Sequence, residues 1–255
     1  IAHPGYHMLT VEDPPEYPIM GANQMPVTNV SGDMERELAY NDAVRGTLRL
    51  DPDVVMIGEV RDRGTLLAAI RLAQTGQKVW ATTHADDALL VFARFFAMGV
   101  ERDFLLDSSV LTGLVSQRLV PLLCPHCARE YPLTGEGINP GQHSRLLALA
   151  DRPGAASLGN IRLRNRSGCP KCNRGIRGRT VVAETVDVSQ SLLDLVASGG
   201  APSARRYWLE EEGGVTLTAH AAHKVFAGHL DPGDAEEIAG YFEGERMQNL
   251  WQVKD

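Results

Sequence analysis

The 255-residue chain carries 25 Lys and Arg against 32 Asp and Glu, a formal net charge of −7, and 44% of its residues are hydrophobic. It is long enough to bury a sizeable core, and it lacks the run of about 18 apolar residues that predicts a spanning helix. The negative charge disfavours nucleic acid and anionic lipid as partners of the surface as a whole. The first residues show no signal-peptide pattern, so we expect a globular, cytoplasmic protein.

The first half alternates short β-rich runs with helical stretches, which is typical of a parallel sheet covered by helices. Strands are predicted at residues 8–14, 53–59 and 78–84, and helices at 33–50, 63–76, 86–99 and 101–120. The strands end on polar residues, which are Glu12 and Asp13, Glu59, and His84. Ligands of open α/β sheets bind outside the carboxyl ends of the strands, so we expect these side chains to converge on one crevice.

The sequence changes character from Pro121. Residues 121–180 contain all four cysteines, many Gly and Pro, and little helical periodicity, which predicts a loop-rich insertion built around a metal. A strand is predicted at 179–188, and short helices at 189–198, 203–212, 216–227 and 233–243. We therefore expect three parts, formed by residues 1–120, 121–180 and 181–255.

The cysteines form two C-x-x-C pairs, Cys124 with Cys127 and Cys169 with Cys172. In a cytosolic chain such pairs are more often a metal site than a disulfide framework. Together they can supply four thiolates to one tetrahedral Zn²⁺, which would be a closed site without an open position for catalysis. A structural role is favoured, because the metal would fold a small lobe with little core of its own. A redox role is the minor alternative.

Several segments resemble, in order and spacing, the motifs of the secretion ATPases of type II secretion and type IV pilus assembly. The segments are TVEDPPEY (10–17), LRLDPDVVMIGEVRD (48–62), ATTHADDA (81–88), LVSQRLVPLLCPHC (114–127) and GCPKCNRGIRGRTVVAE (168–184). They resemble the family's Asp box, Walker B segment, His box and tetracysteine segment. The resemblance runs from about Leu9 to the C-terminal helices. Its cysteines are similar to those of the secretion and pilus-extension branch, since the pilus-retraction branch lacks them.

This resemblance implies an α/β fold, a partial RecA-like P-loop NTPase core with an inserted tetracysteine zinc subdomain and a C-terminal helical region. It implies a cytoplasmic ATPase, peripheral at the inner membrane, that forms a hexameric ring and uses ATP and Mg²⁺. The implied partners are the inner-membrane platform proteins of a secretion or pilus machine. Specific binding of nucleic acid is not expected, because the chain is acidic and lacks interleaved aromatic and basic residues.

The resemblance also implies roles for individual residues. Glu12 is expected to orient or activate the attacking water, Glu59 to hold Mg²⁺ or its water, and His84 to sense the γ-phosphate. Asp13, Arg45, Arg49 and Arg61 are further candidates for nucleotide contact. Without the family context, Glu12 would be interpreted as a surface acid, His84 as a structural histidine, and the arginines as members of structural ion pairs.

The phosphate-binding loop G-x-x-x-x-G-K-[ST] is not found in the sequence. In the family this loop precedes the Asp box, so the resemblance implies that it lies upstream of Ile1. Because the acids and His84 are retained, we expect an ATPase fragment that binds ATP weakly and hydrolyses it negligibly by itself. The alternative is a non-catalytic, zinc-stabilised interaction module that docks on membrane secretion partners.

Overall fold

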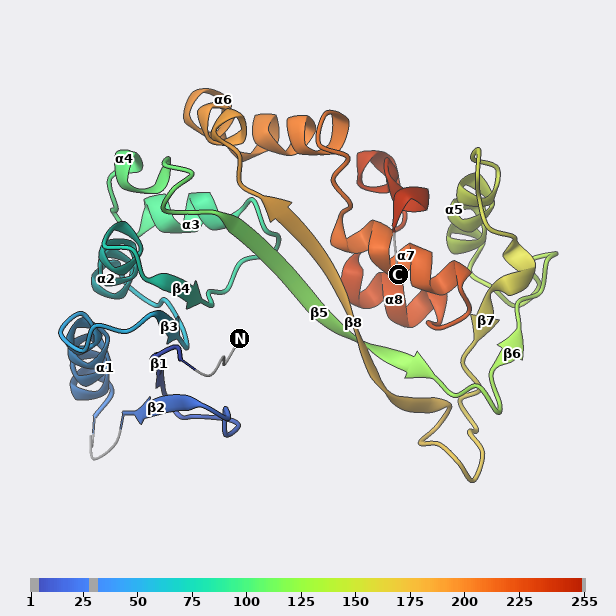
Figure 1. Cartoon of the computed structure of the whole chain (residues 1–255). Helices are drawn as coiled ribbons and strands as arrows, with labels where there is room; N and C mark the ends of the chain where they lie inside the picture. The colour runs from blue at the N-terminus through green and yellow to red at the C-terminus, as the bar shows by residue number, and fades with distance from the viewer. Residues whose placement is uncertain (1–4, 28–31, 254–255) are drawn as a thin grey trace. The chain divides into compact units, whose positions relative to one another are not determined.

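The computed structural model describes residues 5–27 and 32–253 and divides the chain into two compact units (Figure 1). Unit 1 comprises the chain up to Thr112 together with Val188–Ala204. Unit 2 comprises Gly113–Asp187 together with the chain from Arg205 onward. In neither unit do the described residues include a helix with the length and apolar character needed to cross a bilayer.

Unit 1 is built on a parallel four-stranded sheet with the order β2-β1-β3-β4. The strands are β1 (Met8–Glu12), β2 (Ala22–Pro26), β3 (Val54–Ile57) and β4 (Lys78–Ala81). The register places Val11 opposite Ile57, and Ile57 opposite Ala81. The carboxyl ends of β1, β3 and β4 therefore lie at the same edge of the sheet, as the sequence predicted.

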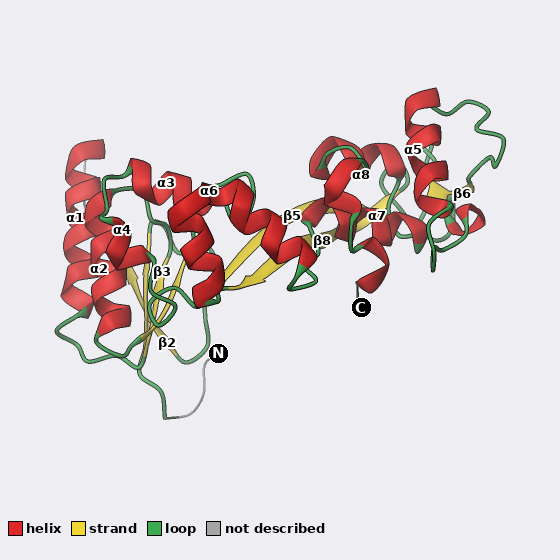
Figure 2. Cartoon of the chain, turned by 90° about the horizontal axis from the view of Figure 1, so that it is seen from above, coloured by secondary structure: helices red, strands yellow, loops and turns green. Residues whose placement is uncertain are grey.

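The helices of unit 1 are α1 (Asp33–Thr47), α2 (Arg63–Gln74), α3 (Val91–Ala97) and α4 (Arg102–Leu105). α1 and α2 lie on the same side of the sheet in both views (Figures 1 and 2). Asp62 caps α2 by accepting a hydrogen bond from the Thr65 backbone N–H at 2.9 Å, and Asn41 of α1 donates to the same carboxylate at 3.1 Å. One side chain thus starts α2 and fixes it against α1.

The predictions for the first half are confirmed in part. The strands at 8–14, 53–59 and 78–84 and the helices at 33–50 and 63–76 are present with shorter bounds, and the helix at 86–99 is confirmed only as α3. Strand β2 was not predicted. The predicted helix at 101–120 is wrong after α4, because residues from Gly113 onward form a strand. That strand pairs with a segment much later in the chain, and such pairing overrides local helical preference.

Unit 2 is built on two long antiparallel strands, β5 (Gly113–Leu123) and β8 (Ile176–Asp187). Helices α7 (Leu217–Phe226) and α8 (Pro232–Ala239) pack on this pair. Their shared core includes the fully buried Val120, Val182, Val225 and Ala235. The predicted strand at 179–188 and the helices at 216–227 and 233–243 are confirmed as β8, α7 and α8.

The predicted helices at 189–198 and 203–212 are the two arms of α6 (Gln190–Glu210), which is interrupted at Gly200. Gly200 has φ of 72°, a conformation that favours glycine, and Pro202 follows it. Short 3₁₀ helices lie at Leu158–Asn160, Gly244–Met247 and Leu250–Gln252.

Between the two cysteine pairs the chain forms β6 (Arg129–Glu130), α5 (Pro140–Ala150) and β7 (Arg162–Leu163). Leu146 and Ile161 from this segment are buried in the same hydrophobic cluster as α7 and α8. Arg145 of α5 also donates to the buried Glu236 of α8, with both nitrogen–oxygen distances at 2.7 Å. The buried side chains of this segment therefore belong to the core that β5, β8 and the C-terminal helices share.

Candidate functional site

The carboxyl edge of the unit 1 sheet carries the polar residues that the sequence singled out. Glu12 is the last residue of β1, while Glu59 and His84 lie in the loops that follow β3 and β4. Nε2 of His84 is 3.3 Å from Oε1 of Glu59. Glu59 and His84, which come from two separate motifs, therefore contact each other beside the ends of β3 and β4.

Glu59 is held from two directions. Its Oε2 accepts a hydrogen bond from Nε of Arg61 at 2.7 Å. Its backbone N–H donates to the hydroxyl of Tyr40 in α1 at 3.0 Å. The Glu59 side chain is 22% exposed and the His84 side chain is 86% exposed, so the carboxylate is anchored whereas the imidazole faces solvent.

Asp13 is linked to Glu59 through Arg61. Its side chain is only 3% exposed and lies between two guanidinium groups. Nε of Arg36 is 2.9 Å from one carboxylate oxygen, and Nη1 of Arg61 is 3.6 Å from the other. Arg61 therefore contacts an acid from each of two motifs, the one that follows β1 and the one that follows β3.

Glu12 is buried, with 8% of its surface exposed, and its Oε1 accepts two hydrogen bonds. The donors are the Thr10 hydroxyl at 2.6 Å and Nε2 of Gln24 at 2.9 Å. Thr10 and Glu12 share one face of β1, since alternate residues of a strand point the same way, and Gln24 belongs to the neighbouring β2. These contacts hold a buried carboxylate in a fixed orientation at the end of β1.

Among the described residues, Arg45 and Arg49 form no ion pair with Glu12, Asp13 or Glu59. Nη1 of Arg45 is 4.0 Å from the carboxylate of Asp42 in an exposed pair on α1, and Arg49 lies in the exposed turn after that helix. Of the three arginines that the sequence singled out, Arg61 is the one that contacts Asp13 and Glu59. Sequence reasoning missed Thr10, Gln24, Arg36 and Tyr40. Of these four residues, only Thr10 could have been found from local sequence, because it lies two residues before Glu12 on the same strand.

The threonines before His84 join the loop after β4 to the loop after β3. The Thr82 hydroxyl donates to the Gly58 carbonyl, and the Val60 backbone N–H donates to the Thr82 carbonyl at 2.8 Å. Thr83 in turn accepts a hydrogen bond from Nε of Arg94 at 2.9 Å. These bonds fix the two loops that present Glu59 and His84.

The environment of the cluster keeps Tyr40 protonated and Arg61 positively charged. Burial is the main cause that raises the pKa of Tyr40 above its ordinary value, so its hydroxyl stays protonated and donates to the Val11 carbonyl at 3.3 Å. The hydrogen bond to Glu59 is the main cause that raises the pKa of Arg61. Arg61 is therefore a permanent cation at physiological pH.

Gly58 allows the ends of β1 and β3 to approach closely. Its backbone N–H donates to the Val11 carbonyl at 2.8 Å. A Cβ at this position would lie 3.0 Å from that carbonyl oxygen and 3.3 Å from Cα of Glu12. A side chain here would therefore force apart the two strand ends that carry the acids.

We predict that Gly58→Ala lowers the free energy of unfolding by about 1–3 kcal/mol, the usual cost of overpacking. The measurement is the urea midpoint of the purified chain. Gly46→Ala is the matched control, because a Cβ there meets nothing within 4 Å, and in a helix this change is expected to stabilise by about 0.5–1 kcal/mol. A Gly58→Ala midpoint equal to that of the unmodified chain would contradict the close approach.

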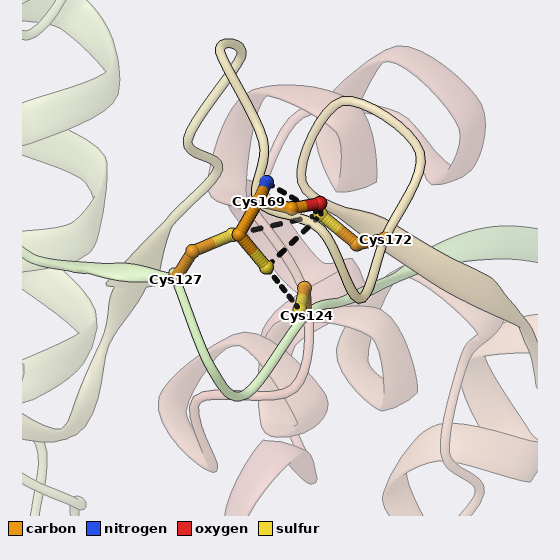
Figure 3. Close-up of side chains that lie close together, drawn as sticks. All are labelled: Cys124, Cys127, Cys169 and Cys172. Atoms are coloured by element: carbon orange, nitrogen blue, oxygen red, sulfur yellow. Dashed lines mark hydrogen bonds between the residues drawn. The ribbon is translucent and has the colours of Figure 1, made fainter.

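The four cysteines of unit 2 converge on one point (Figure 3). Cys124 and Cys127 follow β5, whereas Cys169 and Cys172 lie in the loop before β8. The four sulfurs lie within 4.8 Å of one another, and the closest pairs are separated by 3.7–3.9 Å. In a regular tetrahedron with metal–sulfur bonds of about 2.3 Å, the sulfurs are about 3.8 Å apart. The cluster therefore has the dimensions that a tetrahedral metal ion requires.

Backbone groups complete this site. The N–H groups of Cys169 and Gly175 point at Sγ of Cys172, at 3.2 and 3.3 Å. Gly175 has φ of 85°, and a Cβ there would lie 2.5 Å from the Asn165 carbonyl oxygen, so the loop requires glycine at this position.

The thiols differ in their protonation. Burial, followed by hydrogen bonds to the other three sulfurs, raises the pKa of Cys127 to about 12. Burial acts to raise the pKa of Cys172, but hydrogen bonds from the backbone N–H groups of Cys169 and Gly175 and from the thiols of Cys127 and Cys169 outweigh it, and the pKa is lowered to about 7. A metal ion must therefore displace at least one proton to bind four thiolates.

Comparison with known proteins gives a consistent assignment. The sequence model of the type II/IV secretion system protein family matches residues 1–240. The type IV pilus assembly ATPase PilB of Thermus thermophilus is 34% identical over 229 residues, covering 89% of this chain and 24% of that protein. The type II secretion system ATPase E of Vibrio cholerae is 38% identical over 193 residues, covering 75% of this chain and 35% of that protein.

A solved structure of the pilus retraction motor PilT with bound ADP has a similar fold, with a TM-score of 0.59 and 22% identity, and the match covers 91% of this chain and 52% of that one. The chain thus spans about a quarter to a third of the length of these two curated relatives. Both the partial RecA-like α/β fold and the resemblance are confirmed, and the chain belongs to the type II/IV secretion system protein family.

Proposed function

We propose that this chain is the catalytic C-terminal part of a hexameric cytoplasmic ATPase that powers pilus assembly or type II secretion. The observation that carries the proposal is the contact between His84 and Glu59, beside Asp13 and Glu12, at the carboxyl edge of a parallel sheet. Ligands of this fold class bind at that edge. The relatives, named as ATPases of secretion and pilus assembly, support the same conclusion.

Each residue of the cluster has a distinct role in this proposal. Glu12, fixed by Thr10 and Gln24, orients the water that attacks the γ-phosphate. Glu59 would hold Mg²⁺, either directly or through one of its waters. His84 is exposed and contacts Glu59, so it can sense the γ-phosphate at the same point. Phosphoryl transfer depends mainly on such positioning and on stabilisation of charge.

The same proposal assigns Zn²⁺ to the four cysteines. The sulfur separations match a tetrahedral thiolate site, and four protein ligands leave no position for catalysis. The metal would fix the loop before β8 against the end of β5. Its role is structural.

The nucleotide site requires further groups. The sequence contains no G-x-x-x-x-G-K-[ST] segment whose backbone N–H groups would cradle the phosphates. We propose that a segment outside these 255 residues supplies the cradle, and that neighbouring subunits of a ring complete the site. The ring would act at the inner membrane with the platform proteins of its machine.

We predict that the purified 255-residue chain binds ATP weakly and hydrolyses it at a rate near background, whereas the complete product of its gene turns over ATP. A typical enzyme rate of about 1 s⁻¹ or above is readily separated from background in a phosphate-release assay. Turnover by the isolated chain at the rate of the complete product would contradict the need for a separate cradle.

The second candidate is a non-catalytic, zinc-stabilised interaction module, favoured by the missing phosphate-binding segment. It predicts that the complete gene product hydrolyses no ATP and that Glu59→Gln changes neither ATP binding nor assembly. Measured ATP turnover by the complete product would exclude it.

A further inference from the structure

Arg61 was a candidate for phosphate contact, but its guanidinium group is already engaged by protein groups. Nε donates to Oε2 of Glu59 at 2.7 Å, and Nη1 lies 3.6 Å from Oδ2 of Asp13. Its Cζ lies 5.8 Å from the centroid of the Tyr40 ring. Two carboxylates and an aromatic ring therefore surround one cation that is 47% exposed.

These contacts have a consequence for Glu59. One carboxylate oxygen, Oε2, is taken by Arg61, while the other, Oε1, faces the exposed imidazole of His84 at 3.3 Å. A carboxylate held through one oxygen keeps a single side-chain orientation, because a charge-assisted hydrogen bond is short and strong. Arg61 thus leaves Oε1 as the oxygen that faces His84.

Tyr40 fixes the backbone of the same residue. Its hydroxyl accepts a hydrogen bond from the Glu59 N–H at 3.0 Å and donates to the Val11 carbonyl at 3.3 Å. Its ring supports the Arg61 guanidinium. Tyr40 therefore links the end of β1 to the Glu59 backbone and to Arg61, which holds the Glu59 side chain.

We propose that Arg61 is a positioning residue that holds Glu59 and Asp13 in fixed relation, with Tyr40 as its platform, and that it is not a ligand of the nucleotide phosphates. This inference rests on the proposed ATPase function. A lysine cannot replace Arg61, because the two acids are contacted by separate nitrogens of one planar fork, whereas an ammonium group is a single point charge.

The test is steady-state ATP hydrolysis by the complete gene product carrying Arg61→Lys, Arg61→Gln or Tyr40→Phe. A positioning role predicts that kcat falls about 10–100-fold in the arginine variants, as for residues that orient a metal-binding side chain through a hydrogen bond. KM for ATP is expected to stay within about threefold. Tyr40→Phe keeps the ring and removes the hydroxyl, so it is expected to lower kcat less, by about tenfold. Arg71→Gln, an exposed arginine on α2, is the matched control and keeps normal kinetics.

A direct readout on the 255-residue chain is the NMR signal of the Arg61 Nε–H. We expect this proton to be shifted and protected from exchange in the unmodified chain, and to lose both properties in Glu59→Ala, which removes the acceptor. This measurement requires no catalysis, so it tests the contact independently of the kinetic variants.

The outcomes separate this inference from the proposed function. If Arg61→Lys keeps normal kcat, or raises KM with kcat unchanged, the positioning role is wrong and phosphate contact is favoured in the second case. An Arg61 Nε–H signal that Glu59→Ala does not change would also overturn it. If the complete gene product with unmodified Glu59 hydrolyses no ATP, the proposed function itself fails, whatever the Arg61 variants show.

Discussion

Glu59→Gln in the complete gene product is expected to lower kcat for ATP hydrolysis by about 100–1,000-fold, the range for loss of one preorganised charged group in an active site. The amide has nearly the same shape as the carboxylate but carries no charge. It therefore attracts Mg²⁺ and its waters weakly, and it cannot form the ion pair with Arg61 that the carboxylate forms at 2.7 Å. Binding of ATP is expected to persist, since the proposed phosphate cradle is a separate element.

The measurement pairs phosphate release with binding of a fluorescent ATP analogue. Glu101→Gln is the matched control, because Glu101 is an exposed acid in the same unit, before α4, and is expected to leave kcat unchanged. Hydrolysis by Glu59→Gln within about twofold of the unmodified protein would remove Glu59 from the reaction. Loss of binding together with hydrolysis would instead indicate that Glu59 supports the fold of the site.

Cys169→Ser is expected to abolish stoichiometric Zn²⁺ binding and to unfold the loop before β8. Cys169 contacts Cys124 at 3.9 Å and Cys172 at 3.7 Å, so its loss removes one corner of the tetrahedron. Binding of structural Zn²⁺ contributes on the order of 10 kcal/mol to folding in small zinc modules. The effect on this loop is therefore expected to exceed that of any single packing substitution.

Zinc content by mass spectrometry and limited proteolysis of residues 162–177 provide the measurements. His126→Ala is the matched control, since His126 is exposed between Cys124 and Cys127 and should leave one Zn²⁺ bound. A low zinc content in the unmodified chain, or full zinc content in Cys169→Ser, would refute the site.

The same site should release its metal as the pH falls. Zn²⁺ binds thiolates, whereas Cys127 without metal is protonated up to a pKa of about 12. Lowering the pH therefore favours the protonated thiols over the metal complex. The expected direction is weaker zinc retention at acidic pH in a competition with a chelator.

Local sequence determined the buried strands, the polar residues that follow them and the cysteine pairs. Unbroken apolar runs such as residues 54–57 specify buried parallel strands, and the polar residues that follow each run are carried to one edge because parallel strands end on the same side. The cysteine spacing likewise specifies two sulfur pairs suited to a metal, because each C-x-x-C turn brings two sulfurs together. These features depend on neighbours in the chain, so they can be recognised without coordinates.

Tertiary structure alone decided the rest. Residues 113–120 have no local pattern that excludes a helix, and their pairing with β8 makes them a strand. The anchors of the acids also come from distant segments, as Gln24 reaches Glu12 from β2 and Tyr40 reaches Glu59 from α1. Which groups meet across such separations depends on how strands and helices pack. The sequence therefore identified the acids, and only the packing of β2 and α1 decided what holds them.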